Sequence, residues 1–70
     1  MKREELVKFG KHLKKLRLEK GYTQLQLANE CNFDRNYIGM IERGERNPTL
    51  LSLKTISEGL DISLLELLNY

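Results

Sequence analysis

The sequence lacks the residues from which most small proteins build crosslinks, metal sites and membrane anchors. It has one cysteine and one histidine among 70 residues, so we expect neither an internal disulfide nor a structural metal site. Its charged start, residues 1–5, is followed by no apolar stretch typical of a signal peptide, and no run approaches the roughly 18 apolar residues of a membrane span. These absences predict one small, cytoplasmic domain with no metal and no membrane association.

Residues suited to catalysis are also scarce. His12 is the only imidazole, and no Ser or Cys nucleophile stands near it, so we interpret it as a partly exposed helix residue. Cys31 occupies an apolar position of a predicted helix, where a buried and inert thiol is expected. The sequence has no glycine-rich phosphate loop and no cluster of carboxylates. We therefore expect no enzymatic activity, no cofactor and no small-molecule ligand.

The charge that is present is unevenly distributed. The net charge is +2, but residues 1–20 contain eight Lys or Arg and three Glu, whereas residues 47–70 contain one Lys and three acidic residues. A modest net charge can therefore conceal a local basic face that binds anions. A solvated basic helix face would produce the same count.

Apolar residues recur every three or four positions along almost the whole chain, which indicates helices and no strands. A first helix carries Leu6, Phe9, Leu13 and Leu16 on one face and should end near Lys20–Gly21. Further helices are expected over 23–31, 35–43, about 49–60 and 64–69, with Thr23, Asp34 and Ser63 as capping residues. The sequence thus predicts an all-α, compact five-helix domain that spans residues 1–70.

The second and third helices are short and are joined by a turn of three or four residues, as in a helix-turn-helix, although plain helix corners have this shape too. In a helix-turn-helix the second helix enters the DNA major groove, where Arg35 could pair with guanine and Asn36 with adenine. The polar residues placed to contact phosphates are Thr23, Gln24, Tyr37, Arg43, Arg46 and Asn47. This pattern favours binding to double-stranded DNA.

These residues also carry a resemblance. The stretches 16–24, 27–28, 37–38, 41–44 and 47–49 resemble helix-turn-helix regulators of the phage-repressor and Cro type, over roughly residues 6–68. Within that family, 34–38 with 42–43 and 46–47 look most like the controller proteins of restriction–modification systems. The resemblance implies a homodimeric transcription factor on a palindromic operator, which controls its own gene and the endonuclease gene as activator and repressor. The alternatives are a short phage-type repressor or an antitoxin-type regulator that also binds a partner protein.

The resemblance implies a role for individual residues. It implies base contacts from Arg35 and Asn36, and phosphate contacts from Gln24, Tyr37, Arg43, Arg46 and Asn47. It also implies that Arg17 and Glu42 form a structural ion pair between helices, with a DNA contact as the alternative for Arg17. Three positions depart from the family pattern and leave the operator sequence open: Leu25, Gly39 and Met40. Met40 could touch a thymine methyl group or pack within the protein.

The last helix predicts the dimer surface, at about residues 62–70. It has four leucines in five positions, and one helix face cannot bury all of them in a small domain. The residues assigned to the interface are Leu64, Leu65, Leu67, Leu68 and Tyr70. The alternative is that all four leucines complete the domain's own core. Transcriptional activation would further require contact with RNA polymerase, for which Glu30 or exposed residues of the second and third helices are candidates.

Overall fold

The computed structural model describes residues 2–70 and has five helices: α1 (Arg3–Glu19), α2 (Gln24–Cys31), α3 (Arg35–Glu42), α4 (Leu50–Gly59) and α5 (Leu64–Leu68). No strand occurs in this range, so the predicted all-α fold of five helices is confirmed. The third helix ends one residue earlier than expected. Within the described residues, no helix is long and apolar enough to cross a membrane.

Helices α2, α3 and α5 begin directly after the residues that the sequence marks as caps. The Thr23 hydroxyl accepts a hydrogen bond from the backbone N–H of Gln26 at 3.1 Å, and the Gln26 side chain accepts one from the Thr23 N–H at 2.8 Å. Asp34 caps α3, and Ser63 with Glu66 forms a second capping box at α5. Each cap satisfies amides that the first helical turn leaves without partners, which is why these short helices have defined starts.

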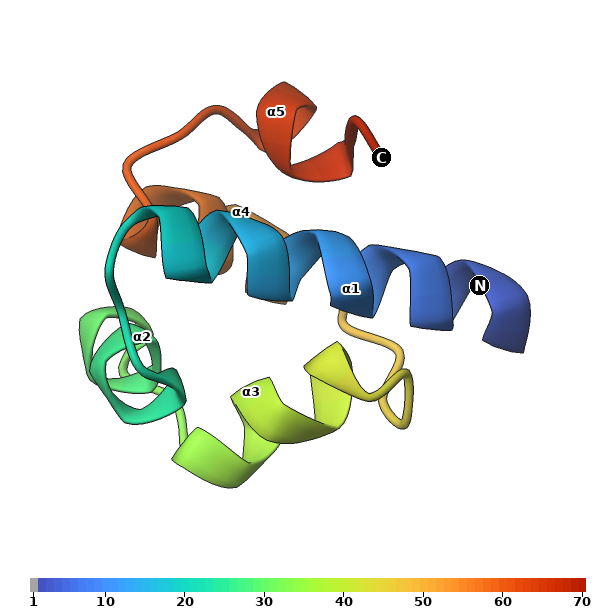
Figure 1. The fold of residues 1–70 in the computed structure, drawn as a ribbon, viewed down its shortest axis with the longest axis horizontal. Helices are drawn as coiled ribbons and strands as arrows, with labels where there is room; N and C mark the ends of the chain where they lie inside the picture. Colours follow the sequence, from blue (N-terminus) through green and yellow to red (C-terminus); the bar gives the residue numbers. More distant parts are fainter. Residues whose placement is uncertain (1) are drawn as a thin grey trace.

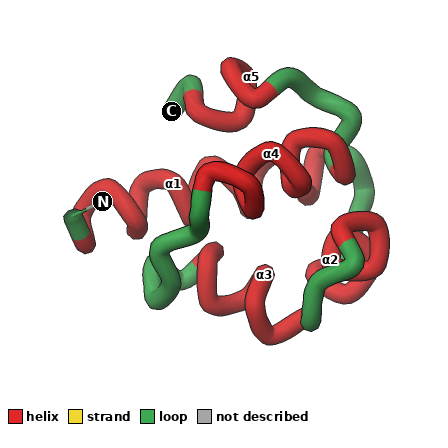
Figure 2. The backbone as a smooth tube through the Cα atoms, turned by 180° about the vertical axis from the view of Figure 1, so that it is seen from behind, coloured by secondary structure: helices red, strands yellow, loops and turns green. Residues whose placement is uncertain are grey.

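The helices wrap around one core. In Figure 1, α1 crosses the middle, with α5 on one side of it and α3 on the other, and Figure 2 shows α4 from the opposite face. Helices α2 and α3 pack against each other, α3 also packs on α1, and α5 packs on α1 and α4. The buried apolar residues are Phe9, Leu13, Leu27, Ala28, Cys31, Ile38, Ile41, Leu53, Ile56, Leu60 and Leu67. Every helix contributes to this core, which fixes the α2–α3 unit from behind and leaves its outer side exposed.

Helix α1 touches the backbone of α3 at Gly10. A Cβ atom at this glycine would lie 2.5 Å from the carbonyl oxygens of both Ile41 and Glu42. Real Cβ atoms essentially never approach that closely. The absence of a side chain at Gly10 therefore allows α1 to support the C-terminal end of α3.

One assignment in the last helix is wrong. Leu67 is completely buried in the domain's own core, so it has no surface left for a partner subunit. Leu64 is half-buried, whereas Leu65 is 80% exposed, and Leu68 and Tyr70 remain exposed as well. The physical reason is the helical period, which turns Leu67 toward the core and Leu65 away from it.

Candidate nucleic-acid interface

The turn between α2 and α3 has a well-defined geometry. Asn32 ends α2 with φ 57°, in the left-handed region that asparagine tolerates better than most residues. The backbone N–H of Phe33 donates to the carbonyl of Ala28 at 2.8 Å, and the Phe33 ring packs edge-on against Tyr37 of α3 with 5.0 Å between centroids. The angle between the two helices is therefore set by contacts on both sides of the turn.

Arg35 and Asn36 lie in the first turn of α3, and both are exposed. Asp34 accepts a hydrogen bond from the backbone N–H of Asn36 at 2.7 Å. Within residues 2–70, the side chains of Arg35 and Asn36 form no hydrogen bond or ion pair. On the opposite face of α3, Ile38 and Ile41 are buried. Two side chains with the donors and acceptors of base readers thus project from a helix whose other face is fixed.

Arg46 lies beside α3 in the loop before α4. The carbon at the centre of its guanidinium is 5.2 Å from the centroid of the Tyr37 ring, and its Nη1 lies 4.0 Å from the sulfur of Met40. The cation–π contact holds a positive charge next to α3 without neutralising it. Met40 is half-buried and packs against this cation.

Arg43, the C-cap residue directly after α3, is paired with a carboxylate. Its Nε donates to Oε2 of Glu45 at 3.0 Å, and its Nη2 donates to Oε1 at 3.2 Å. The hydrogen bonds raise the pKa of Arg43 and lower the pKa of Glu45. Sequence reasoning placed Arg43 on a phosphate and missed Glu45, although an acidic residue two positions from an arginine is visible in the sequence.

Behind the outer face, a buried ion pair joins α1 to α3, as the resemblance implies for Arg17 and Glu42. Their side chains are 7% and 3% exposed. Arg17 donates from Nε to Oε2 of Glu42 at 2.6 Å, from Nη2 to Oε1 at 3.0 Å, and from Nη1 to the carbonyl of Tyr22 at 2.8 Å. Each of the three guanidinium nitrogens has a partner, so the pair connects α1, the α1–α2 turn and α3.

Gln24, the first residue of α2, also joins this network. Its Nε2 donates to Oε1 of Glu42 at 3.1 Å. The other predicted phosphate contacts, Thr23 and Asn47, are exposed at the start of α2 and in the loop before α4. The sequence did not predict the Gln24–Glu42 bond, because it joins residues that are 18 positions apart.

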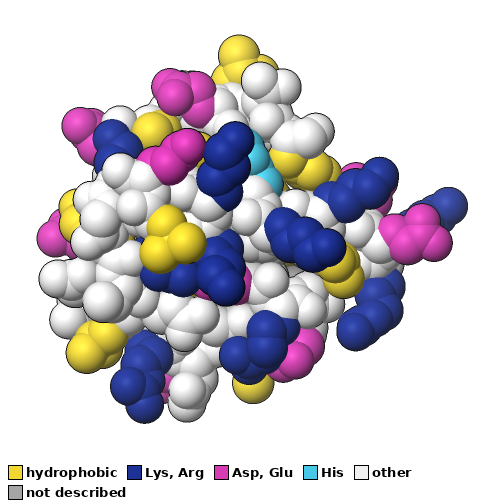
Figure 3. All heavy atoms as spheres, viewed as in Figure 1, with side chains coloured by type: hydrophobic (Ala, Val, Ile, Leu, Met, Phe, Trp, Pro, Cys, Tyr) yellow, Lys and Arg dark blue, Asp and Glu magenta, His cyan; other side chains and the backbone are white. Residues whose placement is uncertain are grey.

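The basic charge of the first 20 residues lies along α1. Figure 3 shows Lys and Arg side chains gathered across the middle of the face on which α1 lies. Lys11, Lys14 and Lys15 line a shallow hollow there with Leu18 and Glu19. The basic N-terminal charge and the candidate base readers thus belong to different helices, α1 and α3.

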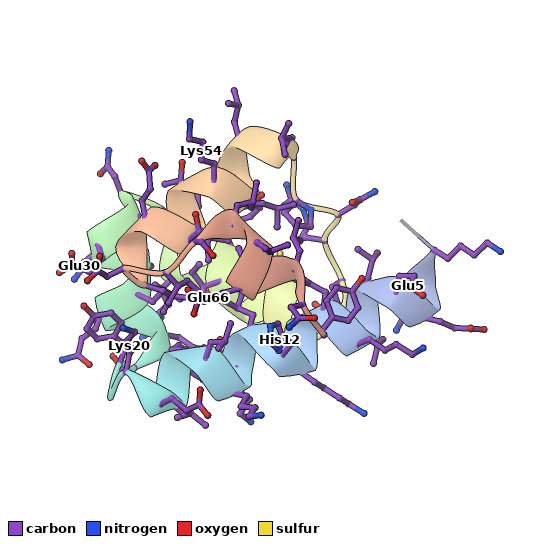
Figure 4. The ribbon with its side chains drawn as sticks, turned by 90° about the horizontal axis from the view of Figure 1, so that it is seen from above. Glu5, His12, Lys20, Glu30, Lys54 and Glu66 are labelled. Carbon is purple, nitrogen blue, oxygen red and sulfur yellow. The ribbon has the colours of Figure 1, made fainter. Side chains whose placement is uncertain are left out.

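The C-terminal residues fold back onto α1. In Figure 4, His12 and Glu66 lie close together where α5 crosses α1, and the His12 Nε2 is 3.1 Å from the carbonyl oxygen of Glu66. The hydroxyl of Tyr70 donates to Glu5 at 2.9 Å, a hydrogen bond that raises the pKa of Tyr70. The Tyr70 ring packs edge-on against Phe9. His12 is thus a partly exposed helix residue, as the sequence indicates.

Comparison with known proteins identifies the α2–α3 unit. Residues 13–67 of this chain match the family described as helix-turn-helix. The chain belongs to the helix-turn-helix family. It is 47% identical to the control protein C.MunI from a Mycoplasma species over 62 residues, which cover 87% of this chain and 84% of that protein.

Solved structures agree with this membership. The restriction–modification controller C.AhdI from Aeromonas hydrophila superposes with a TM-score of 0.90 at 44% identity, covering 91% of this chain and 97% of that chain. The controller C.Esp1396I, solved as a tetramer with its natural 35 base-pair operator, superposes with a TM-score of 0.82 at 48% identity, covering 91% and 88%. In this helix-turn-helix protein, α3 has the position of the recognition helix.

Proposed function

We propose that this helix-turn-helix protein is the controller of a restriction–modification system. It acts in the cytoplasm as a homodimer on a palindromic operator and regulates its own gene and the endonuclease gene. The observation that carries the proposal is the pair Arg35 and Asn36, exposed at the start of a recognition helix whose other face is fixed in the core. The similarity to controller proteins over most of the chain supports the choice of system.

Recognition follows from the chemistry of the α3 surface. Arg35 offers two parallel N–H donors that match O6 and N7 of guanine, and Asn36 can pair with N6 and N7 of adenine. Phosphates bind around this point, through the N-terminus of α2 at the exposed Thr23 and the half-buried Gln24, and through Tyr37, Arg46 and Asn47. The stacking of Arg46 on Tyr37 holds one of these cations in place before DNA arrives.

The dimer forms through α5 and the residues after it. Leu65 and Leu68 are exposed, with Leu64 and Tyr70 beside them in the sequence. A two-fold axis through this surface would hold two recognition helices about 34–36 Å apart, which matches half-sites one turn of DNA apart. Contact with RNA polymerase, needed for activation, is assigned to exposed side chains of α2 such as Glu30.

Selection from random DNA followed by footprinting upstream of the protein's own gene tests the proposal. We expect one palindromic sequence to be selected and the same sequence to be protected in the upstream DNA. Arg35→Ala should weaken binding to that sequence by about 1–3 kcal/mol and leave binding to random DNA nearly unchanged.

The matched control is Lys54→Ala, which removes one positive charge from an exposed position of α4. Figure 4 shows Lys54 on the far side of the molecule from α1. If Arg35→Ala weakened both DNAs equally, Arg35 would be a phosphate contact. If the wild-type protein selected no sequence, the proposed function would be wrong.

A further inference from the structure

Gly39 leaves the middle of one face of the recognition helix without a side chain. Arg35, Gly39 and Arg43 are four residues apart, so they lie on one face of α3. A Cβ atom at Gly39 would lie 3.1 Å from Nη1 of Arg43 and 3.4 Å from Oε1 of Gln24. The guanidinium of Arg43 therefore folds back over the helix and occupies the place that a side chain at position 39 would take.

Glu45 holds the other side of this guanidinium. It accepts from Nε and Nη2 with two roughly parallel hydrogen bonds, which fix the plane of the group as well as its position. Both side chains are about half exposed, and an exposed pair of this kind adds little to stability. A carboxylate beside the recognition helix also reduces attraction to phosphates. Neither a contribution to stability nor an increase in general DNA affinity explains the presence of Glu45. Orientation of the Arg43 guanidinium does explain it.

The pairing leaves a specific set of donors open. Of the five N–H groups of an arginine, Glu45 engages one on Nε and one on Nη2. The two on Nη1 and the second on Nη2 remain, and they form the end-on fork that matches O6 and N7 of guanine. This fork lies on the same face of α3 as Arg35, toward the opposite end of the helix.

We propose that Arg43 reads a base in the major groove, and that Glu45 and Gly39 are the positioning residues that hold it there. This inference rests on the proposed function and deepens it, because it assigns the sequence specificity of the same site. It also replaces the role of phosphate contact for Arg43. Arg46, which stacks on Tyr37 and has no carboxylate partner within residues 2–70, keeps that role.

The test compares binding to two duplexes of equal length, one selected by the wild-type protein from a random pool and one of random sequence. Glu45→Gln should bind random DNA as tightly as the wild type or more tightly, while the ratio of selected to random affinity falls at least about fivefold. Arg43→Lys keeps the charge but loses the fork, so it should lower the same ratio. A repeated selection with either variant should lose preference at one base pair of each half-site.

Glu58→Gln is the matched control, since it removes the same charge from an exposed position of α4 and should leave the ratio unchanged. Gly39→Ala provides a variant that folds, because Ala stabilises a helix interior relative to Gly. Its methyl group displaces Arg43, so the ratio should fall although the unfolding midpoint rises.

Two results would overturn the inference. If Glu45→Gln tightened binding to both duplexes by the same factor, Glu45 would only repel DNA. If Arg43→Lys left the ratio unchanged, Arg43 would be a phosphate contact. Failure of the wild-type protein to select any sequence would instead count against the proposed function, so the two failures are distinguishable.

Discussion

Removing the carboxylate of Glu42 should strongly destabilise the fold. Glu42 accepts hydrogen bonds from Nε and Nη2 of Arg17 and from Nε2 of Gln24. In Glu42→Leu these donors lose their acceptor, and the Arg17 guanidinium stays buried with only the Tyr22 carbonyl as a partner. Breaking one side of a buried ion pair costs about 3–5 kcal/mol, because an uncompensated charge remains in the interior.

That cost is large for a chain of 70 residues. Domains are stable by roughly 0.05–0.15 kcal/mol per residue, so the whole molecule has on the order of 4–10 kcal/mol to lose. In a domain of this size each kcal/mol lowers the melting temperature by about 4–8 °C. Glu42→Leu should therefore melt at least about 12 °C below the wild-type protein.

Urea unfolding followed by circular dichroism, at one fixed protein concentration, measures this loss. The double variant Arg17→Met with Glu42→Leu should recover most of the stability, since two apolar side chains can replace a buried pair at little cost. Glu45→Gln, which breaks the exposed pair with Arg43, is the control and should change stability little. A loss below about 1 kcal/mol in Glu42→Leu, or no recovery in the double variant, would refute the reasoning.

Three further predictions concern the core and the dimer. Gly10→Ala should destabilise the domain by about 1–3 kcal/mol in the same urea assay, since its Cβ would collide with the backbone of α3, whereas Gly39→Ala should not. Burial raises the pKa of Cys31 from 9.0 to about 11, so the thiol of the unfolded chain deprotonates at a lower pH than the thiol of the folded protein. Deprotonation therefore favours the unfolded chain, and stability should fall as pH rises from about 9 to 11. The melting temperature of Cys31→Ala should depend less on pH across that window than the melting temperature of the wild-type protein. Equal pH dependence in the two proteins would show that Cys31 does not cause the loss of stability. The double variant Leu65→Asp with Leu68→Asp should sediment as a monomer and bind the selected operator poorly, and a dimer that persists at micromolar concentration would exclude this surface.

The helices were predictable because the signals that start them are local. Thr23, Asp34 and Ser63 each bond to an amide within three residues, so the sequence alone contains the complete interaction. The buried stripe of α1 follows in the same way from the spacing of Phe9 and Leu13. Short-range chemistry thus determined the elements and their inner faces.

The side-chain network was only partly predictable, because it joins residues from different helices. The resemblance implied the Arg17–Glu42 pair, but nothing in the sequence places Gln24 on the same carboxylate. The folding of Arg43 over Gly39 likewise depends on the side-chain conformation that Glu45 selects. Leu67 is a different case, since its spacing from Leu64 did contain the signal and treating the four leucines as one block obscured it.

The independence of Arg35 and Asn36 from the rest of the molecule has a consequence for evolution. Because their side chains hold no other part of residues 2–70 in place, substituting them should change folding stability by no more than about 0.5 kcal/mol. Mutations at these two positions can therefore accumulate without first requiring compensation in the core. A lineage with this scaffold can acquire a new operator by drift at the protein–DNA contact, and two such regulators in one cell can diverge until neither binds the other's site.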